Sequence, residues 1–146
     1  MIIRYASLSD ADDLLPLMAE LGYPCLLEDF VARVTRFLSN PGYGVAVCKM
    51  NGKICGWIAW SKSELFVLNK TRFHIEGLIV DSKHRGKNIG KKLMEFVEEI
   101  AKSHSPAIID LTSGLRRAQD GSHEFYNRLG YKNEGHMAKL YLRKEL

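Results

Sequence analysis

The stretch that most constrains the fold runs from Arg72 to Leu93 and reads RFHIEGLIVDSKHRGKNIGKKL. Its first part, Arg72 to Val80, is rich in β-branched and apolar residues and predicts a central strand. Its last part opens a helix from Ile89 to about Ser103, in which apolar residues recur at the 3.6-residue period. Strand and helix are therefore joined by a short basic loop that contains Gly86 and Gly90.

This loop, Lys83 to Lys92, has the chemistry of an anion site. A helix leaves its first four N–H groups without intrahelical partners, and its dipole adds about half a positive charge at that end. A glycine-flanked turn before the helix points these groups outward. Four lysines and Arg85 add formal positive charge. Together these features predict a pyrophosphate-binding site.

Two common nucleotide motifs are excluded by their spacing. A Walker A loop has four residues between its glycines, followed by Lys and Ser or Thr. Here three residues separate Gly86 from Gly90, and Lys91 is followed by Lys92, so no hydroxyl is placed for magnesium. The Gly-x-Gly-x-x-Gly dinucleotide fingerprint is also absent.

Composition bounds the class of protein. The 146 residues suit a single domain, 1–146, and the contents of 46% hydrophobic and 26% charged residues are typical of a soluble globular protein. No apolar run approaches the ~20 residues of a membrane span, and the N-terminus lacks a signal-peptide pattern. Three cysteines without CxxC spacing favour a reduced, cytoplasmic protein without a metal site. The net charge of +4 suits an anionic ligand, and no basic run is interleaved with aromatics for nucleic acid.

The order of predicted elements is βααβββαβαββ, an α+β fold with a mostly antiparallel sheet. Ser9 is the expected N-cap of the first helix, and Gly22 ends it. The chain between and after these points alternates strand-like and helix-like runs. We expect strands at 1–6, 43–50, 53–61, 72–80, 107–112, 131–133 and 138–143, and later helices at 28–39, 89–103 and 122–129.

Asn51-Gly52 between two β-rich runs predicts a hairpin with a two-residue type I′ turn. Counting outward from the turn pairs Met50 with Lys53 and Lys49 with Ile54. The same register places Cys48 directly opposite Cys55, and we expect both to be reduced core residues. Trp57 and Trp60 are likewise expected to be core and edge aromatics.

The loop and its flanking elements resemble the acyl-CoA site of the GNAT superfamily of acetyl-CoA-dependent N-acetyltransferases. Its loop pattern is Arg/Gln-x-x-Gly-x-Gly/Ala, and Arg85, Asn88 and Gly90 fall on the Arg, first Gly and last Gly/Ala positions. Asn88 departs from the pattern, but Asn tolerates positive φ better than other non-glycine residues, so the backbone path can be kept. The later segment, IDLTS, a loop with Arg116 and Arg117, and then SHEFYNRLGY from 122 to 131, resembles the family's second motif.

The resemblance implies a three-layer α/β/α fold around a twisted sheet of six to seven strands. It also implies acetyl-CoA as co-substrate, a small-molecule amine as acceptor, and a homodimer as a possible assembly. The adenine and ribose end would lie at the Ser113–Gly121 loop, which is slightly longer than usual. The residues that would contact acetyl-CoA are Leu78, Ile79, Val80, Arg85, Gly86, Lys87, Asn88, Ile89, Gly90 and Lys91.

Two residues are expected to move protons. An alkyl amine with pKa ~10.4 is almost entirely protonated at neutral pH, so a base near the acceptor is useful. Glu76 is the candidate base, with His74 or water as alternatives and an ion pair as its structural alternative. The resemblance places Tyr126 where it would donate a proton to the leaving thiolate, while packing is the alternative. His123 is expected to bond locally near its helix start.

Gly77 is a natural bulge position within the central strand. A freed N–H beside it, that of Leu78, is the expected oxyanion donor. The resemblance further implies that the strand ending at Val80 splays from the following strand to admit the pantetheine arm.

The predicted function is therefore transfer of an acetyl group from acetyl-CoA to a primary amine by direct attack on the thioester. Three alternatives remain open: a protein or peptide N-acetyltransferase, a non-catalytic acyl-CoA sensor, and a nucleic-acid binder supported by charge alone. Stoichiometric acetyl-CoA binding without turnover across a panel of amines would favour the sensor. Salt-sensitive DNA binding that CoA does not affect would favour the nucleic-acid binder.

Overall fold

The computed structural model spans residues 1–146 and describes residues 1–115 and 120–146. Two compact units are formed, residues 1–109 and residues 110–146. The first contains the strand–loop–helix stretch that dominates the sequence.

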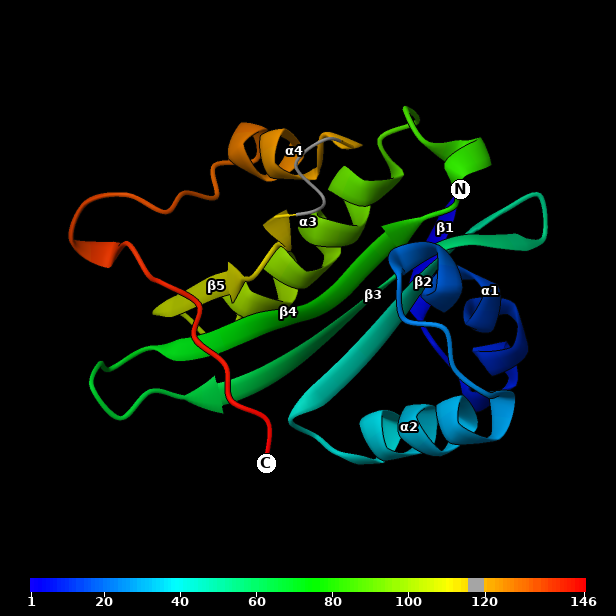
Figure 1. Ribbon diagram of the computed structural model, residues 1–146, viewed down its shortest axis with the longest axis horizontal. Coiled ribbons are helices and arrows are strands. Elements are labelled where there is room, and N and C mark those ends of the chain that lie inside the picture. Colours follow the sequence, from blue (N-terminus) through cyan, green and yellow to red (C-terminus); the bar gives the residue numbers. More distant parts are fainter. Residues whose placement is uncertain (116–119) are drawn as a thin grey trace. The chain divides into compact units, whose positions relative to one another are not determined.

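The helices and strands agree with most of the predicted ranges (Figure 1). Short 3₁₀ turns precede α1 and α3 and follow α4. The strands are β1 (Ile2–Tyr5), β2 (Tyr43–Met50), β3 (Lys53–Glu64), β4 (Thr71–Val80) and β5 (Ala107–Leu111), and the helices are α1 (Ala11–Leu21), α2 (Leu27–Ser39), α3 (Ile89–Lys102) and α4 (Ser122–Arg128).

The described residues form one five-stranded sheet in the order β1-β2-β3-β4-β5, so the prediction of six to seven strands is wrong. β1 to β4 pair antiparallel with their neighbours. Between β4 and β5 the chain crosses over through α3, and the Thr71 N–H bonds to the Pro106 carbonyl at 3.0 Å, which places the starts of both strands together. A crossover of this kind joins parallel strands, so the sheet is mixed.

The two missing strands are the predicted runs 131–133 and 138–143, which adopt no strand. A 3₁₀ turn, Gly135–Met137, lies between them. The side chains of Leu140, Tyr141 and Leu142 in the second run are exposed. High β propensity reflects packing against neighbouring strands, and it does not form a strand without such a partner.

The Asn51-Gly52 hairpin keeps its predicted register for only two pairs. Met50 lies opposite Lys53 and Lys49 opposite Ile54, as expected. A bulge between Cys48 and Lys49 then pairs Cys48 with Gly56, so the predicted pairing of Cys48 with Cys55 is wrong. The thiols are free and remain neighbours, since the Cys55 Sγ–H donates to the Cys48 carbonyl at 3.4 Å. Burial, followed by the Cys55 contact, raises the pKa of Cys48 to about 12.

Helices cover both faces of the sheet within residues 1–109. α1 and α2 lie on one face and α3 on the other (Figure 1). Leu14, Phe30 and Val34 of the first two helices are buried in one cluster with Trp57 and Ile79 of the sheet. On the other face, α3 buries Ile89, Leu93, Met94, Val97 and Ala101. This arrangement confirms the three-layer expectation for the first unit.

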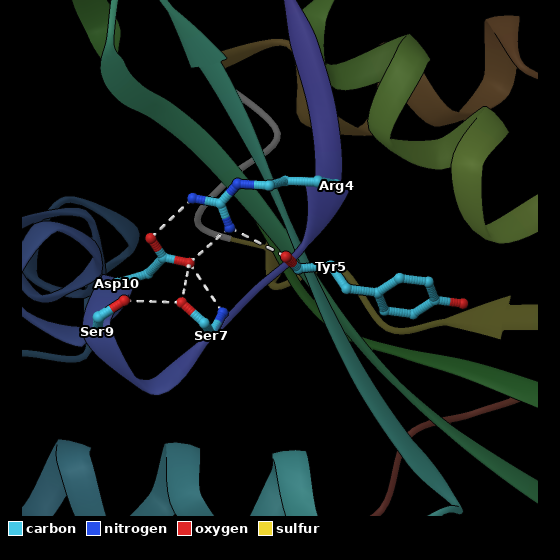
Figure 2. Close-up of polar contacts among 5 residues, drawn as sticks. All are labelled: Arg4, Tyr5, Ser7, Ser9 and Asp10. Atoms are coloured by element: carbon cyan, nitrogen blue, oxygen red, sulfur yellow. Dashed lines mark hydrogen bonds and ion pairs between the residues drawn. The ribbon is translucent and has the colours of Figure 1, made fainter.

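An ion pair fixes the path from β1 into α1 (Figure 2). Arg4 of β1 binds Asp10 with both terminal nitrogens, at 2.8 and 3.0 Å, and Asp10 is buried. The Ser7 N–H donates to the same carboxylate at 2.8 Å. Asp10, and not the predicted Ser9, stands at the N-cap position of α1, where its side chain makes no capping bond to the helix. The Ser9 hydroxyl contacts the Ser7 hydroxyl at 2.8 Å. The Arg4 hydrogen bonds, helped by the Ser7 N–H, lower the pKa of Asp10 to about 2.

Within residues 110–146, aromatic side chains pack around α4. The Tyr126 ring contacts Phe125 at a centroid distance of 5.0 Å and Tyr131 at 6.2 Å. His123 donates from Nε2 to the Gly114 carbonyl at 3.0 Å. This local bond is the role that the sequence predicts for His123.

Candidate functional site

The centre of the candidate site is a bulge in β4. The register between β3 and β4 passes from Ala59 opposite Gly77 to Trp60 opposite Ile75. Glu76 is therefore the extra residue of β4, one position before the predicted Gly77. A bulge of this kind interrupts the ladder and redirects a side chain, as is common beside functional sites.

Glu76 is held at this bulge by a residue of the neighbouring strand. Its side chain is exposed, and Oε1 accepts a hydrogen bond from the Ser61 hydroxyl at 2.8 Å. The Cα of Ser61 pairs with that of His74, so this contact crosses the ladder diagonally. The hydroxyl orients the carboxylate while Oε2 takes no part in the bond. Sequence reasoning selects Glu76 but gives no signal for Ser61.

His74, the alternative base, is engaged through its own ring nitrogen. Arg72 Nη2 lies 3.0 Å from His74 Nδ1. A guanidinium carries only donors, so Nδ1 must accept and the imidazole carries its proton on Nε2. The lone pair that a base would use is therefore committed to Arg72. This observation favours Glu76 over His74 for proton collection.

The extra residue of the bulge is Glu76 and not the predicted Gly77, which pairs with Ala59. The absence of a side chain at Gly77 has a packing reason. A Cβ at this position would lie 2.9 Å from two ring carbons of Trp57 and 3.6 Å from Leu21 Cδ2. Trp57 is 5% exposed and belongs to the core beneath α1 and α2. The absent side chain lets the indole pack directly against β4. Leu78, Ile79 and Val80, the predicted contacts for the pantetheine arm, follow immediately and pair with residues 56–58 of β3.

The loop after β4 begins with a capped 3₁₀ turn, Ser82–His84. Asp81 is its N-cap, and its carboxylate accepts the Lys83 N–H at 2.9 Å. This bond lowers the pKa of Asp81 below its usual range. Gly86 then has φ +80° and Asn88 φ +62°, while Arg85 is extended. The left-handed Asn88 confirms that the backbone path survives the departure from the glycine pattern.

The start of α3 suits an anion. Asn88 is its N-cap, and its side chain makes no capping bond. The first intrahelical bond runs from the Lys92 N–H to the Asn88 carbonyl at 3.0 Å, so the amides of Ile89, Gly90 and Lys91 have no partner within the helix. The space beside Gly86 is open, since a Cβ at this position would meet no atom within 4 Å. The exposed side chain of Lys87 adds charge at the same turn. These groups suit the binding of a phosphate or diphosphate.

A residue of α1 that contacts this loop, Glu20, gives no functional signal in the sequence. Glu20, in the last turn of α1, accepts the Ser82 N–H at 2.9 Å and lies 3.3 Å from Arg85 Nη2. Arg85 also donates from Nε to the Val80 carbonyl at 3.3 Å. In the sequence Glu20 is one acidic residue on an amphipathic helix. A contact across more than 60 positions leaves no periodic signal.

Two predicted features are not part of the site in residues 1–109. Tyr126 belongs to the second unit, so its role toward the thiolate stays a prediction. Arg116 and Arg117 lie outside the described residues, and the predicted adenine and ribose contacts of the Ser113–Gly121 loop stay untested with them.

Comparison with known proteins identifies the family. The sequence profile of the acetyltransferase (GNAT) family matches residues 11–131. This span includes both helices that cover one sheet face, the β4 bulge and the loop before α3. The chain belongs to the GNAT family of acetyltransferases.

Individual relatives agree with this assignment. The chain is 28% identical over 137 residues to an aminoalkylphosphonate N-acetyltransferase of Salmonella typhimurium, covering 89% of this chain and 84% of that protein. An uncharacterised N-acetyltransferase of Methanocaldococcus jannaschii is 34% identical over 101 residues, 68% of this chain. That match spans only 43% of the archaeal protein's own length. A GNAT family acetyltransferase of Staphylococcus aureus has a crystal structure that superposes with a TM-score of 0.80, 26% identity and coverage of 99% and 98% of the two chains.

Other site classes find no support in the described part of the GNAT chain. Within residues 1–115 and 120–146, no group of three or more His, Cys, Asp or Glu side chains is arranged to hold a metal ion. None of the helices described combines the length and apolar composition of a membrane span.

Proposed function

We propose that this GNAT protein transfers an acetyl group from acetyl-CoA to the primary amine of a small-molecule acceptor. The observation that carries the proposal is the turn of Gly86 and Asn88 in the loop between β4 and α3. This turn leads into the N-terminus of α3, where the Asn88 side chain makes no capping bond. Such a turn presents converging backbone N–H groups and a helix dipole to a diphosphate. Arg85 and Gly90 stand at the first and last positions of the family's loop pattern, and Asn88 replaces its first glycine.

Acetyl-CoA supplies the thioester, which is the activated acyl group of the reaction. The residues proposed to hold it are Leu78–Val80 on β4 and Arg85–Lys91 in the loop and first turn of α3. The Leu78 N–H, next to the bulge, is the proposed donor to the thioester oxygen. Donors of this kind are worth most where charge develops during the reaction.

Glu76 is the proposed base for the acceptor amine. At neutral pH an alkyl amine of pKa ~10.4 is protonated in all but about one molecule in two thousand, equivalent to roughly 4–5 kcal/mol. A carboxylate that collects this proton, directly or through water, offsets part of that deficit. Two contacts support Glu76 over His74: the Ser61 hydroxyl orients its carboxylate, and Arg72 occupies His74 Nδ1. Tyr126 is the proposed donor to the leaving thiolate.

The first test is a panel of primary amines assayed for release of free CoA from acetyl-CoA. The panel should include aminoalkylphosphonates, because the Salmonella typhimurium relative, which aligns over most of both chains, is named an aminoalkylphosphonate N-acetyltransferase. Peptides with free N-termini and lysines should be included as well. Saturable CoA release with a small amine supports the proposal. Release with peptides only would assign the protein acetyltransferase alternative, and stoichiometric binding without turnover would assign the sensor.

A further inference from the structure

The last turn of α1 reaches the coenzyme loop through one carboxylate oxygen. Glu20 Oε1 accepts the Ser82 backbone N–H at 2.9 Å and also lies 3.3 Å from Arg85 Nη2. The Glu20 side chain is 28% exposed. One oxygen atom therefore joins a helix on one face of the sheet to both ends of a four-residue segment of the loop.

Arg85 is fixed on two sides by this arrangement. Its Nε donates to the Val80 carbonyl, the last residue of β4, at 3.3 Å, while Nη2 faces Glu20. A guanidinium has five N–H donors in a rigid plane. Two contacts to two different elements set the direction of that plane, and Nη1 is not used by either. Arg85 is also the arginine of the proposed diphosphate loop.

The same turn of α1 borders the bulge of β4. Leu21 Cδ2 lies 3.6 Å from the position that a Cβ at Gly77 would take. Gly22, with φ +107°, ends the helix directly afterwards. Glu20 therefore lies at a helix end that packs beside the residues proposed for acetyl transfer. Because the helix that carries Glu20 is packed against the sheet, its contact with the loop differs from a chance ion pair between two surface side chains.

We propose that Glu20 is a positioning residue for acetyl-CoA. It holds the Ser82 amide and the Arg85 guanidinium in place before the diphosphate arrives, so that less side-chain and loop freedom is lost on binding. This inference rests on the proposed function and adds α1, which contributes no residue to the loop sequence, to the determinants of coenzyme affinity. It assigns Glu20 no contact with the reacting atoms.

The decisive experiment is calorimetric titration of the 146-residue chain with acetyl-CoA, comparing Glu20→Ala and Glu20→Gln with the parent. Glu20→Ala removes both contacts and is expected to raise the Kd roughly tenfold, the effect of ordering one side chain and a short loop segment on binding. Glu20→Gln keeps an oxygen acceptor for the Ser82 N–H, so its Kd is expected to lie between those of the parent and Glu20→Ala. Asp13→Asn is the matched control, because it removes the same charge from an exposed position of the same helix.

Kinetics and hydrogen exchange separate positioning from a general effect on stability. Glu20→Ala is expected to raise the KM for acetyl-CoA while kcat at saturation changes little, and to speed exchange of the Ser82 amide. If the parent binds acetyl-CoA and Glu20→Ala binds it equally well or more tightly, the inference is wrong while the proposed function stands. If the parent does not bind acetyl-CoA, the proposed function fails and this inference fails with it.

Discussion

At the scale of single residues, the proposed role of Glu76 as a base depends on how its side chain is placed. It is the extra residue of the β4 bulge, and a hydroxyl from the adjacent strand binds one of its oxygens. Arg72 engages the competing imidazole of His74. Neighbouring side chains on the two strands thus hold Glu76 and His74 in different hydrogen bonds, although both residues are candidate bases by sequence alone.

Glu76→Gln is expected to lower the rate of CoA release most strongly near neutral pH. The amide cannot collect a proton, while a higher pH deprotonates more of the free amine and so restores part of the rate. The measurement is kcat/KM against pH, and the profile of the variant should be shifted upward. Glu64→Gln, at the exposed end of β3, is the control. Full activity of Glu76→Gln at pH 7 would return Glu76 to a structural role and leave water as the base.

Tyr126→Phe is expected to lower kcat while acetyl-CoA affinity changes little. A thiolate with an ordinary thiol pKa of ~8.5 is already a fair leaving group, so the loss should be smaller than the ~10²–10⁴-fold of a typical general acid. Steady-state kinetics and calorimetry on the same preparation make the comparison, and Tyr131→Phe is the control on the neighbouring ring. Loss of binding in place of turnover would mean that Tyr126 packs against the coenzyme.

At the scale of elements, the structure of the β4–loop–α3 segment can be predicted from sequence because the residues that determine it lie close together in the chain. Turn residues, helix amides and strand composition all lie within Arg72–Leu93, and the left-handed conformation at Asn88 follows from its residue type. The predicted hairpin register is wrong from the third residue before the turn. The bulge that shifts it depends on packing across the sheet, which the local sequence does not reveal. At Gly56, a Cβ would stand 2.9 Å from the Ile79 carbonyl of the next strand.

Contacts between distant segments leave no comparable pattern. The contact of Glu20 in α1 with Ser82 in the loop leaves no periodic feature in the sequence, and Ser61 is one of two serines of its strand. The residues after Gly130 present the opposite case: their composition predicts strands, yet Leu140 and Leu142 remain exposed. Propensity identifies segments that can become strands, and the pairing partner decides whether they do.

The loop itself can be tested by a pair of substitutions at Asn88. Asn88→Gly is expected to keep acetyl-CoA affinity, because glycine adopts φ +62° readily and the Asn88 side chain makes no capping bond. Asn88→Val places a β-branched residue in the left-handed region, which costs roughly 1–2 kcal/mol, and should lower both the melting temperature and the affinity. Gly90→Asp, which adds a negative charge in the first turn, should abolish most binding while the fold survives.

Calorimetry and thermal melts on the three variants give a clear answer. A large loss of affinity in Asn88→Gly would show that the asparagine side chain itself contacts the ligand. Unchanged affinity in Gly90→Asp would remove the diphosphate assignment from this turn.

At the scale of the whole molecule, stability in acid depends on the ion pair that joins β1 to α1. Asp10 is the buried acidic residue of the first unit, and Arg4 holds it from the first strand of the sheet. The pKa of Asp10 is lowered from 3.8 to about 2 in the folded protein, with the Arg4 hydrogen bonds as the main cause. A lowered carboxyl pKa stabilises the fold above the unfolded-state value, and that stability is lost as the pH falls from about 4 to 2.

Asp10→Asn is therefore expected to destabilise the protein at pH 7 by up to about 2 kcal/mol, less what solvent screening removes at the partly exposed Arg4. The difference between parent and variant should shrink as the pH is lowered through 4 toward 2, because the parent carboxylate is then protonated as well. Urea unfolding at several pH values measures it, with Asp12→Asn as the control at an exposed first-turn position. A difference that stays constant from pH 7 to pH 2 would show that the Asn substitution acts through packing, and that the charge of Asp10 contributes nothing.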